Sequence, residues 1–234
     1  MQTTSKVLFL VESQFTERDY DRFGVETFEE KGINVEVLNL SPLLRPHYFE
    51  AIKKSDSYSF KKEVFVESKE DFYKAIIGLD KKTNVICILG PNKDNRFVFS
   101  FLEKMKIFYG FLFQGLLPSS VTSNKESSLY STLKKYLRIL IRYQPSPSFV
   151  ITAGDRASKK AQYNFPKEDY KEVSSFSLDY NIFLGYQDEA KTQKFAVFLD
   201  ENQPYHPDYV HAQMKPNCES AIYYDELNLS LIHI

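Results

Sequence analysis

A stiff polar segment near the C-terminal end of the chain carries the residues best suited to acid–base chemistry. It has the sequence DENQPYHPDY, and two prolines restrict its backbone. A histidine beside carboxylates can act as a general base or hold a hydroxyl group of a ligand. We predict catalytic roles for three residues of this segment, His206, Asp200 and Glu201, and substrate-binding roles for Tyr205 and Asp208. The alternative is that the segment only packs at a domain junction.

A second candidate is the turn Glu12-Ser13-Gln14, which follows the apolar run Val7–Val11. A helix that begins after this turn offers free N–H groups to an anion or a hydroxyl group. We predict that Glu12, Ser13, Arg18 and Asp19 bind substrate, although Arg18 and Asp19 are equally typical of surface charges. Because no glycine precedes Gly24, the glycine-rich fingerprint of dinucleotide binders is absent.

Two further segments carry polar groups at the expected ends of strands. In Thr152–Arg156 the small residues allow a ligand to approach the backbone, so Gly154 and Asp155 are predicted binding residues. The alternative there is a helix start with Asp155 as the N-cap. Asp179 and Tyr180 are predicted to face the same cleft as Asp200, although Tyr180 also suits the edge of a core.

Strands that alternate with helices must position these residues. Lys6–Glu12 is predicted to be a buried strand, followed by a helix to about Lys31 that Gly32 ends, and by a second strand over Ile33–Leu40. Further strands are predicted at Glu63–Val66, Asn84–Leu89, Phe108–Phe113, Phe149–Thr152 and Phe195–Leu199. This alternation predicts one α/β domain over residues 1–228, with a doubly wound, mostly parallel, Rossmann-like sheet in three α/β/α layers. In such sheets ligands bind at the carboxyl ends of the strands.

Composition limits the classes of partner. The 30 basic and 31 acidic residues give a formal net charge of -1, which disfavours a nucleic-acid-binding protein. Cys87 and Cys218 share no spacing with other ligands, and one histidine among scattered carboxylates is a weak metal pattern, so we predict no metal site. The polar start and the lack of any long apolar run predict a cytoplasmic protein without a transmembrane segment. A peripheral contact with a membrane stays open.

The last six residues, LSLIHI, follow a polar stretch without a cap. Residues 229–234 resemble translated sequencing-adapter read-through, which predicts a non-native tail and a natural chain that continues past about Asn228. The alternative is a genuine short C-terminal strand.

Three segments resemble bacterial proteins of surface polysaccharide biosynthesis that are glycosyltransferase-like. They are VLFLVESQFTERDYDRFG, FSLDYNIF and, above all, AVFLDENQPYHPDY, and the resemblance extends over most of Lys6–Tyr224. It implies an enzyme with two Rossmann-like halves, of the GT-B type, in which the N-terminal half shapes the acceptor site. The C-terminal half would bind the nucleotide-sugar donor, and this chain ends before such a half.

The resemblance therefore implies the acceptor-side domain of a glycosyltransferase for capsule or lipopolysaccharide assembly. Its partners would be a carbohydrate acceptor and the missing C-terminal domain. This chain alone is expected to bind no cofactor and to be inactive, whereas the full-length protein would use a nucleotide sugar. The alternative is a non-catalytic α/β module that binds a carbohydrate or a nucleotide.

Overall fold

The computed structural model describes residues 4–52, 60–113, 144–165, 170–175, 203–206, 209 and 213–232. The described strands are β1 Lys6–Val11, β2 Asn34–Asn39, β3 Glu63–Phe65, β4 Thr83–Cys87, β5 Tyr109–Phe113, β6 Phe149–Thr152 and β7 Lys171–Ser174. The described helices are α1 Glu17–Arg22, α2 Val25–Glu30, α3 Ser41–Leu44, α4 Pro46–Ile52, α5 Lys69–Ile77, α6 Arg96–Lys104, α8 Gly154–Asn164, the 3-10 helix η3 Gln203–Tyr205 and α11 Ser220–Ile232.

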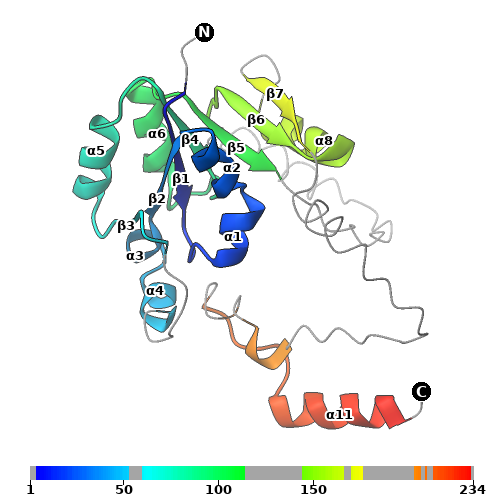
Figure 1. Cartoon of the computed structure of the whole chain (residues 1–234). Coiled ribbons are helices and arrows are strands. Elements are labelled where there is room, and N and C mark those ends of the chain that lie inside the picture. Colours follow the sequence, from blue (N-terminus) through cyan, green and yellow to red (C-terminus); the bar gives the residue numbers. More distant parts are fainter. Residues whose placement is uncertain are drawn as a thin grey trace, which may run out of the picture.

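The described strands form one seven-stranded sheet in the order β3-β2-β1-β4-β5-β6-β7. Every neighbouring pair is parallel, with Val11 opposite Asn39 between β1 and β2, and Thr152 opposite Ser174 between β6 and β7. Helices lie on both faces of this sheet (Figure 1). The predicted three-layer, Rossmann-like α/β/α fold is confirmed. Because the strand order reverses at β1, the carboxyl ends of β1 and β4 flank the topological switch point.

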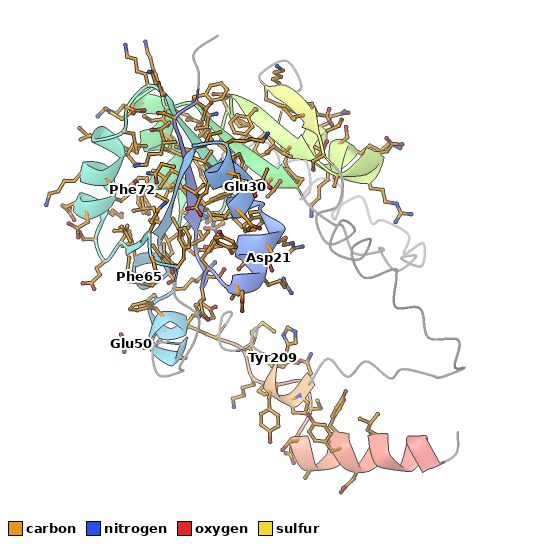
Figure 2. All side chains as sticks on the ribbon, viewed as in Figure 1. Asp21, Glu30, Glu50, Phe65, Phe72 and Tyr209 are labelled. Atoms are coloured by element: carbon orange, nitrogen blue, oxygen red, sulfur yellow. The ribbon has the colours of Figure 1, made fainter. Side chains whose placement is uncertain are left out.

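Alternating side chains of the strands feed two separate cores. One face of the sheet carries a core that includes Leu8 and Leu10 of β1, Phe72 of α5, residues of α6, and Ala161 of α8. Phe72, which is labelled in Figure 2, is fully buried. On the other face, Val7 and Phe9 pack with residues of α1 and α2. This division follows from the period of two residues along a strand, which sends successive side chains to opposite faces.

Cys87 lies in the first of these cores, as expected for a thiol inside an apolar strand. Burial raises its pKa far above the ordinary value of a thiol. A thiol that stays protonated is a poor nucleophile and a poor metal ligand. Cys87 therefore contributes packing rather than chemistry.

The predicted helix between the first two strands is wrong in one respect, because it is divided into α1 and α2. Gly24 separates them with φ of 63°, a left-handed conformation that glycine adopts at little cost. The second helix ends before Gly32, as predicted, and Ile33 N–H donates to the carbonyl oxygen of Phe28 at 2.9 Å.

Other differences concern short elements. Two short helices, α3 and α4, follow β2 directly. The strand β7 was not predicted, because Lys171–Ser174 holds a single large apolar residue. Residues 220–232 form the helix α11, so the alternative of a short C-terminal strand is wrong. The predicted strand Phe195–Leu199 lies outside the described residues.

Candidate functional site

The turn that follows β1 is closed by contacts within the chain. The carboxylate of Glu12 pairs with the guanidinium of Arg45, with Oε2 and Nη2 3.6 Å apart. The carbonyl oxygen of Ser13 accepts a hydrogen bond from Asn39 Nδ2 at 3.0 Å. The N–H of Gln14 donates to the hydroxyl of Tyr48 at 3.4 Å. These bonds tie the turn to β2 and to the helices α3 and α4.

Asp19 serves to start helix α1. Its Oδ2 accepts from Thr16 N–H at 3.0 Å and from Thr16 Oγ1 at 2.8 Å, while its own N–H donates to Thr16 Oγ1 at 3.3 Å. This reciprocal arrangement is a capping box, which satisfies N–H groups that a short helix leaves open. Arg18, the neighbouring predicted binding residue, is exposed on α1. Of the residues predicted to bind a ligand at this turn, Glu12, Ser13 and Asp19 are thus engaged in its structure through the contacts described.

Two residues that were not predicted hold this turn in place. Asn39 is fully buried at the carboxyl end of β2, and its Nδ2 donates to Glu63 Oε1 at 2.6 Å as well as to Ser13. Its Oδ1 accepts from Ser41 N–H at 2.8 Å. Burial raises the pKa of Glu63, while the hydrogen bonds from Asn39 and from the Phe15 N–H act in the opposite direction. The sequence signal for this role was the amide side chain of Asn39 at the end of the strand β2.

An open pocket of about 640 Å³ lies at the carboxyl ends of β6 and β7, against the start of α8. The described residues that line it are Thr152, Ala153, Gly154, Asp155, Ser158, Glu172, Ser174 and Ser175. Two of the predicted binding residues, Gly154 and Asp155, are among them. The pocket lies at the carboxyl ends of parallel strands, as the rule expects, but at the β6 and β7 end of the sheet rather than at the switch point between β1 and β4.

The entry into α8 shapes one wall of the pocket. Gly154 has φ of 81°, and a side chain added there would meet no atom within 4 Å, so the backbone is open to the pocket. The N-cap is Ala153, which makes no side-chain hydrogen bond, so the alternative of Asp155 as N-cap is wrong. Asp155 instead lies in the first turn, where its negative charge is favourable beside the positive end of the helix dipole.

The opposite wall comes from the edge strand β7. Thr152 Oγ1 donates to Glu172 Oε1 at 2.9 Å, which fixes the carboxylate between the two strands. The neighbouring Tyr170 is buried, and its pKa is raised by burial and by the negative charge of Glu172. Val150 of β6 and Ala157 and Ala161 of α8 are buried. The helix α8 is thus packed against the rest of the described chain through its apolar side.

The other predicted residues are placed as follows. Tyr205 is 64% exposed in η3, and the half-buried His206 follows it directly. Asp179, Tyr180, Asp200, Glu201 and Asp208 lie outside the described residues. The described structure thus brings Gly154 and Asp155 to one pocket. Glu12, Ser13 and Asp19 lie elsewhere, in the turn after β1, where contacts within the chain occupy them.

Of the polar lining residues, Asp155 alone was predicted to bind substrate. Ser158 lies one turn after Gly154 on α8, so a helix starting at Gly154 would have indicated it. Glu172 could be found only by recognising β7 as a strand. Ser174 and Ser175 also line the pocket, a few residues before the predicted binding residues Asp179 and Tyr180.

The lining groups favour hydrogen bonding over covalent chemistry. The hydroxyls of Ser158 and Ser174 can donate and accept, the hydroxyl of Thr152 donates to Glu172 and can accept, and the carboxylates of Asp155 and Glu172 accept. Within the described residues, no three His, Cys, Asp or Glu side chains gather where they could hold a metal ion. In the same part of the chain, every helix is too short or too polar to cross a membrane.

Comparison of the chain with protein-family models, with curated proteins and with solved structures finds no match in any of the three.

Proposed function

We propose that this chain is the acceptor-side domain of a glycosyltransferase-like protein of bacterial surface polysaccharide biosynthesis, acting in the cytoplasm. The observation that carries the proposal is the hydroxyl- and carboxylate-lined pocket at the carboxyl ends of β6 and β7. Support also comes from the all-parallel, Rossmann-like sheet and from the three segments that resemble such proteins.

The pocket suits a sugar in size and chemistry. Its volume of about 640 Å³ falls in the range of small-molecule sites. Sugar hydroxyls both donate and accept hydrogen bonds, and the serine hydroxyls of the lining can do the same. The carboxylates of Asp155 and Glu172 can accept from two hydroxyl groups of one ring. The pocket therefore supplies matched partners to a polyhydroxylated ligand.

In the proposed enzyme a carboxylate or His206 deprotonates the acceptor hydroxyl, and a second Rossmann-like half holds the sugar diphosphate. General bases of this kind act on a hydroxyl within hydrogen-bond reach. A non-catalytic carbohydrate-binding module is the second candidate. It is favoured by one observation, namely that no histidine stands among the described residues that line the pocket.

Binding by this chain tests the proposal directly. We expect millimolar monosaccharides to shift the backbone amide resonances of Gly154, Asp155 and Ser158, because these residues line the pocket. The nucleotide sugar UDP-glucose should leave the same resonances in place. The proposal is contradicted if no monosaccharide shifts them, or if UDP-glucose binds this chain tightly.

The enzyme and the module are separated by a transfer assay on a protein that carries both halves. We expect His206→Ala to reduce sugar transfer while the thermal unfolding midpoint of the acceptor-side domain stays unchanged. Full turnover by the variant would remove His206 from the mechanism. Sugar binding without any transfer by the unmutated protein would favour the module.

A further inference from the structure

The edge of the sheet opposite the pocket carries the connections that enter β4 and β5. Because all the described strands are parallel, their amino ends lie at this one edge. The N–H of Val85 on β4 donates to the carbonyl oxygen of Phe108, directly before β5, at 3.1 Å, so the two connections lie side by side. The helices α5 and α6, which lead into them, cover the same face of the sheet (Figure 1).

The ends of α5 and α6 expose large apolar side chains at this edge. Tyr73 of α5 and Phe101 of α6 pack against each other, with ring centroids 4.2 Å apart. Residues four apart lie on the same side of a helix, so Ile77 and Met105 occupy the corresponding positions one turn further along. Their side chains are 61% and 38% exposed, and the nearby Phe108 is 49% exposed.

Exposed lysines accompany these apolar residues. Lys81 and Lys82 lie in the connection into β4, Lys104 ends α6, and Lys106 lies in the connection into β5. None of the four forms an ion pair with another described residue. We call the surface made by these lysines together with Ile77, Met105 and Phe108 the entry patch.

The carboxylates in these connections are engaged in the turns themselves. Asp80 accepts a hydrogen bond from Thr83 Oγ1 at 2.9 Å. Glu103 accepts from the hydroxyl of Tyr109 at 3.1 Å and from Ser146 N–H at 2.8 Å. Two carboxylates therefore stand against four lysines, and positive charge is in excess at the entry patch.

We propose that the entry patch binds the surface of a membrane that contains anionic lipids. Lysines near such a surface are attracted to its negative charge, and exposed apolar side chains bury themselves at the boundary of headgroups and acyl chains. A nucleic acid would also attract the lysines, but it would leave Ile77 and Met105 in water. The combination of both kinds of side chain favours a lipid surface. The inference is independent of the proposed function, because it involves neither the pocket nor a sugar.

Vesicle flotation of the 234-residue chain tests the proposal. The probes are vesicles of phosphatidylcholine alone and vesicles of phosphatidylcholine and phosphatidylglycerol in equal parts. We expect the chain to bind the mixed vesicles more than about tenfold more tightly, and to bind them less tightly as salt is added. Failure to bind the mixed vesicles, or equal binding to both kinds, would overturn the inference.

Lysine variants assign the attraction to the entry patch. Lys81→Gln and Lys106→Gln should each weaken binding to the mixed vesicles about fivefold. The matched control is Lys93→Gln, which removes the same charge from an exposed position that follows β4 at the opposite edge of the sheet, and it should change binding little. Equal losses in the three variants would show that binding follows the net charge of the chain, which refutes the assignment.

An apolar variant tests insertion. Ile77→Ser should weaken binding about fivefold, at high salt as well as at low salt, because the loss of apolar burial is not screened. The control Val64→Ser removes an exposed apolar side chain from β3, outside the entry patch, and should have no effect. Phe108 is kept, because its ring stacks on Phe149 at 5.2 Å and its removal would also disturb packing. Unchanged vesicle binding by Ile77→Ser would refute insertion.

A nucleic-acid partner is the competing outcome. Single-stranded poly(U) RNA is therefore tested with the same lysine variants, and we expect no binding that depends on the entry patch. If the lysine variants lose RNA binding and keep vesicle binding, the inference is wrong and the entry patch is a nucleic-acid site. Sugar binding at the pocket is measured separately, so either result leaves the proposed function standing.

Discussion

Replacing Asn39 by aspartate should destabilise the protein strongly at neutral pH and less at acidic pH. The change keeps the size of the side chain but replaces the donor Nδ2 by an acceptor oxygen. That oxygen would face the carbonyl oxygen of Ser13 and Oε1 of Glu63, which now receive hydrogen bonds at 3.0 and 2.6 Å. The bond from Ser41 N–H to the other oxygen can persist.

The magnitude follows from the bonds that are lost. A neutral hydrogen bond contributes about 1 kcal/mol, and one to a charged group about 1.5–3 kcal/mol. Placing a second buried carboxylate against Glu63 adds the cost of an unpaired charge, so the free energy of unfolding should fall by about 3–5 kcal/mol. At lower pH one of the two carboxyl groups is protonated, and its O–H donates a hydrogen bond to the other carboxyl group. Part of the lost stability then returns.

Urea denaturation followed by circular dichroism, at neutral pH and at about pH 5, measures both effects. The matched control is Asn34→Asp, because Asn34 Nδ2 also donates to a carboxylate, that of Glu36 at 2.9 Å, but at an exposed position. The control should lose less than about 1 kcal/mol. If Asn39→Asp is as stable as the unmutated protein, or if its loss is the same at both pH values, the account of the turn is refuted.

Gly110→Ala should destabilise the protein by about 1–3 kcal/mol in urea denaturation, because an added Cβ collides with the backbone and ring of Phe149 on β6. The control Gly78→Ala, where the nearest atom stands at 3.5 Å, should change little, and an equal loss in the two variants would contradict this contact. Burial raises the pKa of Glu63 in the folded state. Its contribution to the free energy of unfolding is therefore fully present below the ordinary pKa of a glutamate, and it is lost as pH rises through the pKa of the folded state. The stability of Glu63→Gln relative to the unmutated protein should therefore increase as pH rises from about 4 to 7 in a series of denaturation curves. If the difference in stability between the two proteins is the same at every pH, Glu63 is not the titrating group.

The fold was largely predictable, because its strongest signals are local. Apolar runs such as Val7–Val11 identify strands that are buried on both faces, and their alternation with helices identifies the parallel sheet. The short edge strand β7 has no such apolar run, because most of its residues are exposed to solvent. The break at Gly24 was also missed, because a helical stripe of apolar residues continues across it.

The candidate site was predictable only where it coincides with the end of a strong strand. Gly154 and Asp155 follow β6 directly, and the position alone indicated them. Glu12 and Asp19 occupy an equivalent position after β1, but their partners Arg45 and Thr16 decide their role. Arg45 is distant in sequence from Glu12, and no spacing rule connects the two residues. Whether a polar group is open to a ligand thus depends on tertiary contacts that a single sequence does not display.

The place of the pocket at the edge of the sheet affects how its walls open. Within the described sheet β7 is bonded to β6 alone, whereas β1 lies between β2 and β4. Local unfolding of an edge strand breaks one ladder of hydrogen bonds instead of two, so the amides of β7 should exchange with deuterated solvent well before those of β1. A ligand that bridges Glu172 and Asp155 would slow this exchange. Deuterium uptake at Lys171–Ser174 would thereby report occupancy of the pocket in mixtures where the ligand has not been identified.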